Sequence, residues 1–566
     1  NTTAADNTAV GKGSLTANTT GSANAAVGAL ALTANTTGNY NVAVGGSALA
    51  ANTTAENNIA IGLNAMATNT TGEHNVAIGR DALTANTTAA NNTAVGKDAL
   101  KANTTGSENV AVGTSALLVS TTADNNTSVG HESLTANTTG ANNVAVGYRT
   151  LYVNTTGGSN VAIGSGNALG ANTTASNNVA VGNAALAANT TGASNIGIGT
   201  AALEANTTAA NNVAVGKGAL AANTTGTRNT AVGSLALDGN TTADYCTALG
   251  YTALGAANAA NNNTAIGDSC LKLNTSGTNN TGLGQAALDQ NTTGGNNTAL
   301  GRGAMEVNTT GDNNTAVGVA ALDANTTASN NTAVGKSALA ANTTAANNVA
   351  VGSGSLIVNT TGAGNTAVGW EAGKLNTTGA NNTIVGRRAG ITLTTGSANL
   401  ILGNSAGQAG TPGGAITTAD NQILLGDDNI TNAHIQVDWT IASDARDKTD
   451  VEDLSIGLDF VKQLKPKTYR WDKRSQYSKD QSIDPDGSYK TEQLDVGFLA
   501  QDVDALEKSL GFKDTDKKNL ISSVSEDGQM YGLKYSKFVP MLVNAVQELS
   551  AEVEELKKKA HNKCEE

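Results

Sequence analysis

Aromatic residues are nearly absent from this chain of 566 residues, at 3% of the total. Proline occurs only 4 times, whereas glycine occurs 65 times. A large globular core depends on aromatic and bulky aliphatic side chains, so this composition excludes a conventional globular protein of this size. All the phenylalanines lie in the last quarter of the chain, at Phe460, Phe498, Phe512 and Phe538.

Cysteine is equally scarce, and its 3 copies are Cys246, Cys270 and Cys564. An odd number of cysteines so far apart indicates no disulfide framework. We also find no apolar run of 18 or more residues, so we expect no membrane span. No basic patch with interleaved aromatics occurs, so we expect no nucleic-acid partner. The sequence shows no cluster typical of a metal site, and we expect no metal and no cofactor.

Charge is unevenly distributed between the two ends of the chain. The net charge is −13, from 33 Lys and Arg against 46 Asp and Glu. Of these, 20 basic and 25 acidic residues lie from Ser443 onward, in less than a quarter of the chain. We infer that two different kinds of protein are joined near residue 443.

What the first part contains is a seventeen-residue repeat, such as NNTAVGKDALKANTTGS at 91–107. Its marker is an apolar residue followed by Gly, which recurs 24 times between Val10 and Leu402 with one eighteen-residue step after Ile163. Regular periods of this length are typical of solenoids. We therefore expect residues 1–407 to form a repetitive shaft.

Within each repeat, period-two patterns predict two short strands. Val110 and Val112 share one face of the first, and Leu100 and Ala102 share a face of the second. Gly and the Asn-Thr-Thr-Gly segment separate the strands, because Gly and Asn tolerate the backbone of tight corners. We interpret each repeat as one coil of a parallel β-roll or β-helix.

The apolar residues of a repeat are mostly Val, Ala and one Leu, which predicts a thin core and an association of several chains. The repeats loosely resemble the head of trimeric autotransporter adhesins, whose repeats also carry an Asn-x-Ala-Val/Ile-Gly strand. Two geometries stay open. A chain that coils on itself rises about 4.8 Å per coil, whereas three interleaved chains would each advance three strand spacings.

Nearly every repeat presents Asn-Thr-Thr, as at Asn103-Thr104-Thr105. Three interpretations compete. Stacked Asn and Thr side chains can form hydrogen-bonded ladders at a corner. Asn-x-Thr is also an acceptor for glycosylation. The third is a flat threonine array that orders water or ice.

Residues 408–442 interrupt the period and form a predicted neck. Residues 410–414 read as a loop, and 422–426 look like one last coil. We expect 430–441, with His434, Val437 and Trp439, to be rich in strands.

The C-terminal part carries four motifs in order. They are Ser-Asp-Ala-Arg-Asp-Lys at 443–448, Leu-Lys-Pro-Lys-Thr-Tyr-Arg-Trp at 464–471, Val-Gly-Phe-Leu-Ala-Gln-Asp-Val at 496–503, and Tyr-Ser at 535–536 with a closing helix. This series resembles the S74 peptidase family, the intramolecular chaperones of endosialidase-type tailspikes and of many tail fibres. The resemblance implies an α+β chaperone domain over 443–535 and a C-terminal helix over 536–566.

The resemblance also implies chemistry. Domains of this family trimerise, guide folding of the upstream β-fibre and are cut off before the motif serine, here at the Ala442–Ser443 bond. Ser443 is then the nucleophile and Lys448 the general base, with Asp444 and Arg446 as supporting motif residues. A hydroxyl needs such a base, and a lysine serves when burial disfavours its charged form. A degenerate pair would leave the domain attached.

The last helix has a heptad pattern, which predicts a coiled coil. Its apolar seam consists of Val539, Leu542, Val546, Leu549, Val553 and Leu556. The family resemblance implies three strands. Glu548 and the charged residues beyond it read as a solvated face.

These features favour a homotrimeric extracellular fibre, a phage tail fibre that reaches and attaches to a receptor or glycan on the host cell. At most it catalyses one self-cleavage, and we expect no enzyme activity on an external substrate. The alternative is a bacterial cell-surface adhesin or matrix fibre with a retained trimerisation domain. A glycan-degrading tailspike would need a carboxylate pair in a groove, and the repeats single out none.

Overall fold

The computed structural model describes residues 3–256, 259–411, 413–436, 440–478, 483–511, 520–526, 528 and 530–564. The chain divides into two compact units, Asn1–Thr327 and Ala328–Glu566. No helix in the described part of the chain is both long and apolar enough to cross a membrane.

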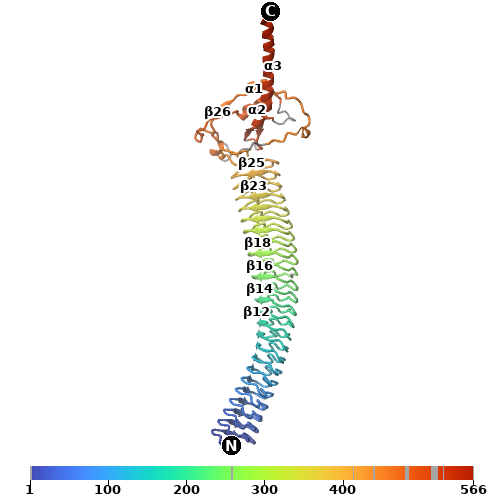
Figure 1. Cartoon of the computed structure of the whole chain (residues 1–566), viewed down its shortest axis with the longest axis vertical. Helices are drawn as coiled ribbons and strands as arrows, with labels where there is room; N and C mark the ends of the chain where they lie inside the picture. The colour runs from blue at the N-terminus through green and yellow to red at the C-terminus, as the bar shows by residue number, and fades with distance from the viewer. Residues whose placement is uncertain are drawn as a thin grey trace. The chain divides into compact units, whose positions relative to one another are not determined.

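The first unit is a parallel β-solenoid, in which each three-residue strand pairs with the next one along the chain (Figure 1). Partners follow the seventeen-residue spacing, as in Val110↔Thr127, except for Val161↔Val179, which absorbs the single longer step. Its strands are β1 (Thr8–Val10), β2 (Ala25–Val27), β3 (Val42–Val44), β4 (Ile59–Ile61), β5 (Val76–Ile78), β6 (Thr93–Val95), β7 (Val110–Val112), β8 (Thr127–Val129), β9 (Val144–Val146), β10 (Val161–Ile163), β11 (Val179–Val181), β12 (Ile196–Ile198), β13 (Val213–Val215), β14 (Thr230–Val232), β15 (Thr247–Leu249), β16 (Thr264–Ile266), β17 (Thr281–Leu283), β18 (Thr298–Leu300) and β19 (Thr315–Val317). The pairing within one chain confirms the geometry in which the chain coils on itself.

Each strand ends at the predicted marker, and the glycine that follows has a steric cause. Gly113 has φ +134°, and a Cβ atom built on it would lie 2.5 Å from the carbonyl oxygen of Gly130 in the next coil. Coils stack too closely there for any side chain. The same conformation recurs along the solenoid. The glycine of the marker therefore repeats in the sequence because this backbone contact repeats in the structure.

The second predicted strand of each repeat is wrong. Residues 97–102 form consecutive turns, and Leu100 adopts a left-handed backbone with φ +50°. This conformation breaks period-two alternation, so Ala99 and Leu100 are both fully buried while Ala102 is half-buried. The Leu100 N–H instead donates to the Ala116 carbonyl of the next coil at 2.9 Å.

The core of a coil is thin, as predicted. In strand β7 only the central Ala111 points inward, and both valines lie on the half-exposed outer face. Ala99 and Leu100 complete the apolar interior, and Asn103 and Asn109 are buried beside them. Since small side chains fill the interior, stability depends on many coils stacked in register.

The second unit begins with further strands of the same kind, β20 (Thr332–Val334), β21 (Val349–Val351), β22 (Thr366–Val368), β23 (Thr383–Val385), β24 (Leu400–Leu402) and β25 (Ile423–Leu425). Strand β25 pairs with β24, which confirms the predicted last coil after the interruption. Among the described residues 430–436 and 440–441 there is no strand, so the prediction of a strand-rich neck is wrong there. Val437 and Trp439 lie outside the described residues.

The C-terminal domain of this unit is small and mixed. It contains the helices α1 (Leu458–Gln463), α2 (Ala500–Ser509) and α3 (Phe538–Cys564), the short turns η1 (Ala445–Asp447), η2 (Arg474–Gln476) and η3 (Tyr535–Lys537), and the antiparallel pairs β26 (Lys467–Tyr469) with β27 (Asp495–Gly497) and β28 (Ser522–Val524) with β29 (Tyr531–Leu533).

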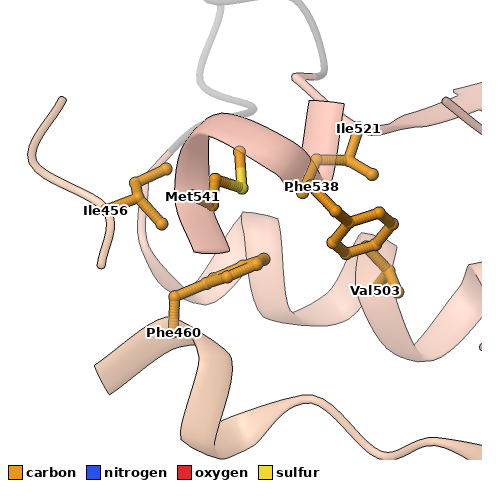
Figure 2. Close-up of a cluster of buried hydrophobic side chains, with 6 residues drawn as sticks. All are labelled: Ile456, Phe460, Val503, Ile521, Phe538 and Met541. Carbon is orange, nitrogen blue, oxygen red and sulfur yellow. The ribbon is translucent and has the colours of Figure 1, made fainter. Parts of the chain in front are cut away.

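The three helices of this domain meet around one apolar cluster (Figure 2). Phe460 comes from α1, Val503 from α2, and Phe538 and Met541 from the start of α3. Ile456 and Ile521 complete the cluster, and each of its members is at most 5% exposed. The domain therefore has its own core, in which the first turns of α3 take part.

Candidate functional site

The structure brings Ser443 and Lys448 into contact. The Lys448 Nζ atom donates to the Ser443 Oγ atom at 2.7 Å and to the Ser443 carbonyl at 3.3 Å. A nucleophile and a base must lie within this distance for proton transfer. Their catalytic roles, and the cleavage site at Ala442–Ser443, stay predictions.

The motif residues between them explain this geometry. Asp444 caps the η1 turn, because its Oδ1 atom accepts from the Arg446 N–H at 2.9 Å. The Arg446 guanidinium returns to the same carboxylate at 2.6 Å. Hydrogen bonds from the Arg446 side chain and backbone lower the pKa of Asp444. The single turn folds the chain back, so that Lys448 faces Ser443 across five positions.

The pair is open to solvent in the single chain. Every described residue from 440 to 455 is exposed, including Ala442, Ser443 and Lys448. The Ala442–Ser443 bond is therefore accessible. None of the described residues buries the amine of Lys448.

Helix α3 has two faces with different roles. Phe538, Met541 and Ala545 are buried against the domain. The six predicted seam residues are 40–63% exposed: Val539, Leu542, Val546, Leu549, Val553 and Leu556. The described residues leave this apolar stripe of α3 exposed, and its role in trimerisation stays a prediction.

The expectation that Glu548 belongs only to a solvated face is wrong, because its side chain contacts a distant segment of the domain. Its carboxylate accepts from the Leu458 N–H at 2.6 Å, at the start of α1. One turn earlier, the Asn544 side chain donates to the Leu454 carbonyl at 3.0 Å and the Ile456 carbonyl at 3.2 Å. Helix α3 thus fixes the segment that leads from Lys448 to α1. Nothing local in the sequence marks this contact between distant segments.

Two buried carboxylates on α2 also escaped the sequence analysis. Glu507 is 1% exposed and accepts from the Ile521 N–H at 2.6 Å and the Ser522 N–H at 3.1 Å. Asp504 pairs with Lys508 at 2.8 Å. The sequence does contain a signal for their burial. Asp504 and Glu507 directly follow the apolar residues Val503 and Leu506 of the same helix. Glu507 holds the β28–β29 hairpin on α2.

The Asn-Thr-Thr corners support the ladder interpretation. Asn103 is fully buried, and its side-chain amide donates to Asn86 Oδ1 at 3.1 Å and to the Gly106 carbonyl at 2.9 Å. The Thr104 hydroxyl donates to the Thr121 carbonyl at 3.0 Å. A glycan on Asn103 would need the same buried nitrogen, so glycosylation there is incompatible with the folded solenoid. Thr105 of this corner is exposed and Thr104 is half-buried, so the corner exposes one threonine per coil fully.

The three cysteines form no disulfide in the described part of the chain. Cys246 and Cys270 are buried in the solenoid, and Cys564 is exposed at the end of α3. Burial raises the pKa of Cys270 to about 12, so this thiol is inert at neutral pH.

A repetitive parallel β-solenoid followed along the chain by a small mixed domain is typical of fibre-type β-solenoid proteins. Residues 443–512 match the family described as chaperone of endosialidase. No curated protein and no solved structure matches the chain. Residues 443–512 are thus similar to endosialidase chaperone domains, and the combination with a β-solenoid is consistent with a protein of the tail-fibre or tailspike type.

Proposed function

We propose that this chain forms a homotrimeric tail fibre whose C-terminal domain guides folding and then removes itself at the Ala442–Ser443 bond. The observation that carries the proposal is the 2.7 Å contact between Ser443 Oγ and Lys448 Nζ, directly after the bond to be cut. The domain boundaries at 407/408, 442/443 and 535/536 belong to the same proposal. The fibre acts outside the cell, as part of a virion.

The reaction is a single turnover. The Ser443 Oγ attacks the carbonyl carbon of Ala442, and its proton passes to the amine of Lys448. The C–N bond breaks, the Ser443 nitrogen takes that proton, and an ester joins Ala442 to Ser443 Oγ. Water then hydrolyses the ester, which leaves a carboxylate on Ala442 and a free amine on Ser443.

Trimerisation supports both steps. Burying the six exposed seam residues of α3 needs other helices, and second copies of this chain offer the same seam. A neighbouring chain that covers the exposed pair would disfavour the charged form of a lysine and so provide the base. Cleavage would then occur only after the three chains have assembled.

The folding role has a physical reason. A parallel solenoid whose coils are nearly identical can pair in the wrong register, because neighbouring repeats offer almost the same partners. Non-local strand pairing is also slow. A domain that joins three chains at one end sets a common starting point from which coils can stack.

Attachment to a host is supported by an aromatic patch on the solenoid surface. Tyr148 is 52% exposed, stacks on His131 of the preceding coil with ring centroids 5.7 Å apart, and lies 5.6 Å from the Arg149 guanidinium. Exposed tyrosine and arginine together are typical of binding surfaces. We propose a cell-surface receptor or glycan as the partner.

The test is the intact mass of the purified chain beside Ser443→Ala and Lys448→Met. The wild type should yield one product ending at Ala442 and one beginning at Ser443, and both variants should stay whole. Ser455→Ala changes another exposed serine of the same segment and should still be cut. An uncut wild-type chain would contradict self-cleavage and support the alternative, a cell-surface fibre with a retained trimerisation domain.

A further inference from the structure

Each solenoid corner uses the next coil to satisfy its backbone. The Thr377 and Thr378 N–H groups donate to the Thr394 carbonyl at 2.7 and 3.4 Å. One coil later, the Thr394 and Thr395 N–H groups donate to the Thr417 carbonyl at 2.8 and 3.2 Å. The first threonine hydroxyl of each corner joins them, as in Thr394 Oγ1 to Thr417 O at 2.9 Å. One carbonyl oxygen thus collects several donors.

The last corner has no such carbonyl above it, because β25 is the final strand of the solenoid among the described residues. Thr417, Thr418 and Ala419 would therefore leave their N–H groups without a partner from a further coil. Unpaired backbone donors cost free energy, and a sheet end also invites pairing with other chains.

A carboxylate occupies this position. Glu526, between strands β28 and β29, accepts from the N–H groups of Thr417 at 2.8 Å, Thr418 at 2.9 Å and Ala419 at 3.2 Å. The hydroxyls of both threonines also donate to it, that of Thr417 at 2.9 Å. Its oxygens therefore receive the donors that a carbonyl of the next coil receives elsewhere.

Charge and support fit this role. Partial burial acts to raise the pKa of Glu526, but the hydrogen bonds from the Thr418 hydroxyl and from Thr417 outweigh it and lower the pKa to about 2. The hairpin that carries Glu526 is held on α2 by the buried Glu507. The carboxylate is thus ionised at neutral pH and presented from a fixed element.

We propose that the corner Thr417–Ala419 is a carboxylate-binding site at the end of the solenoid, and that Glu526 fills it in the uncut chain. The Glu526 carboxylate accepts the hydrogen bonds that a backbone carbonyl of the next coil accepts at the other corners. Resting on the proposed self-cleavage, departure of the C-terminal domain removes Glu526 and leaves three amides and two hydroxyls for the carboxylate of an external ligand, such as an acidic sugar.

The experiment uses the full chain with Ser443→Ala, so its result does not depend on whether the wild type cleaves. Hydrogen exchange at Thr417, Thr418 and Ala419 is compared with Glu526→Ala, Glu526→Gln and the matched exposed control Glu492→Ala. Charge-assisted hydrogen bonds of this kind should slow exchange at least about tenfold. Both Glu526 variants should lose this protection, while Glu492→Ala and the interior corner at Thr394 keep theirs.

Glu526→Ala then serves as the empty site. Propionate and glucuronate, a carboxylate on a hydrocarbon and one on a sugar, should restore protection at the three amides, and chloride at equal ionic strength should not. Rescue by glucuronate alone would assign the site to acidic sugars. Protection that survives in Glu526→Ala, or that neither carboxylate restores, would overturn the proposal.

Discussion

At the scale of single residues, the buried asparagines show how much depends on identical neighbours. In most coils the Asn-Thr-Thr asparagine donates to its counterpart one coil earlier, as Asn154 does to Asn137 at 2.9 Å. At Ser120 the side chain is too short to do so. Asn103 Oδ1 and Ser120 Oγ are consequently both buried without a hydrogen-bond partner in the part of the chain that the structure describes. The ladder has a gap at this coil.

Ser120→Asn should therefore stabilise the solenoid. The new amide can donate to Asn103 Oδ1, and the site has the backbone of coils that already hold asparagine. Satisfying a buried acceptor is worth about 1–2 kcal/mol. The measurement is the free energy of local opening around Asn103, from native-state hydrogen exchange. Ser120→Ala, which removes a hydroxyl without a partner, should change little, and an equal effect of the two substitutions would contradict the explanation.

The hydrogen-bonded ladder of corner asparagines was among the interpretations of the sequence, but the backbone conformation of Leu100 was not predicted. Corner asparagines have a local signature, since they recur before two threonines in nearly every repeat. A left-handed leucine has none, because leucine rarely adopts that backbone and stacking imposes it here. The second strand was predicted wrongly for this reason.

At the scale of elements, the β28–β29 hairpin connects two regions that the sequence analysis treated separately. Its tip residue Glu526 is far along the chain from Thr417 and Thr418, and no motif relates them. The marker glycines and strand β25, in contrast, were predictable, because each repeat imposes the same backbone contact on the next. Periodic signals predict repeated contacts, and single long-range contacts leave no such signal.

The Glu526 contact should depend on pH in a defined window. Its pKa is lowered from 4.5 to about 2 in the folded chain, so the contact stabilises fully above pH 4.5 and weakens as pH falls from 4.5 through 2. The denaturation midpoint of the C-terminal domain should be higher in Ser443→Ala than in Ser443→Ala with Glu526→Gln at pH 7. The difference should shrink as the pH falls from 4.5 and vanish only below about pH 2.

The comparison between these two proteins isolates Glu526. Asp420, whose carboxylate accepts from the Ser397 N–H at 2.6 Å in the same corner, is present in both proteins, so its contribution to the difference cancels. The buried Asp504 and Glu507 are also present in both proteins, so their contributions to the difference cancel as well. A difference that stays constant from pH 7 to pH 2 would show that the ionised carboxylate is not what holds the hairpin.

At the scale of the whole molecule, assembly is proposed to control the reaction. The sequence predicted both the serine and lysine pair and the seam from motifs that are local: the short segment 443–448 for the pair, and a heptad for the helix. What surrounds the pair in an assembly comes from distant segments and other chains. The exposed state of Ser443 and Lys448 was therefore not predictable from their spacing.

Val546→Asp combined with Leu549→Asp should abolish trimerisation without unfolding the domain, since these side chains are 61% and 47% exposed and lie outside its core. When both proteins also carry Ser443→Ala, sedimentation should give the seam variant one third of the mass of its parent. With Ser443 intact, the seam variant should also stay uncut.

Gln547→Asp adds a charge between the two seam positions on an exposed part of α3 and is the matched control. It should remain trimeric and be cleaved. A seam variant that keeps the mass of the wild type would contradict the role of these residues. A monomeric variant that still cleaves would separate assembly from cleavage.

The repeat itself has a consequence for how such a protein changes over generations. Because each coil ends where the next begins with the same backbone geometry, deleting or duplicating one whole repeat joins matching corners and disturbs neither end of the solenoid. Recombination between near-identical repeats supplies such changes. The reach of the solenoid can thus be inherited as a whole number of coils, in steps of about 4.8 Å.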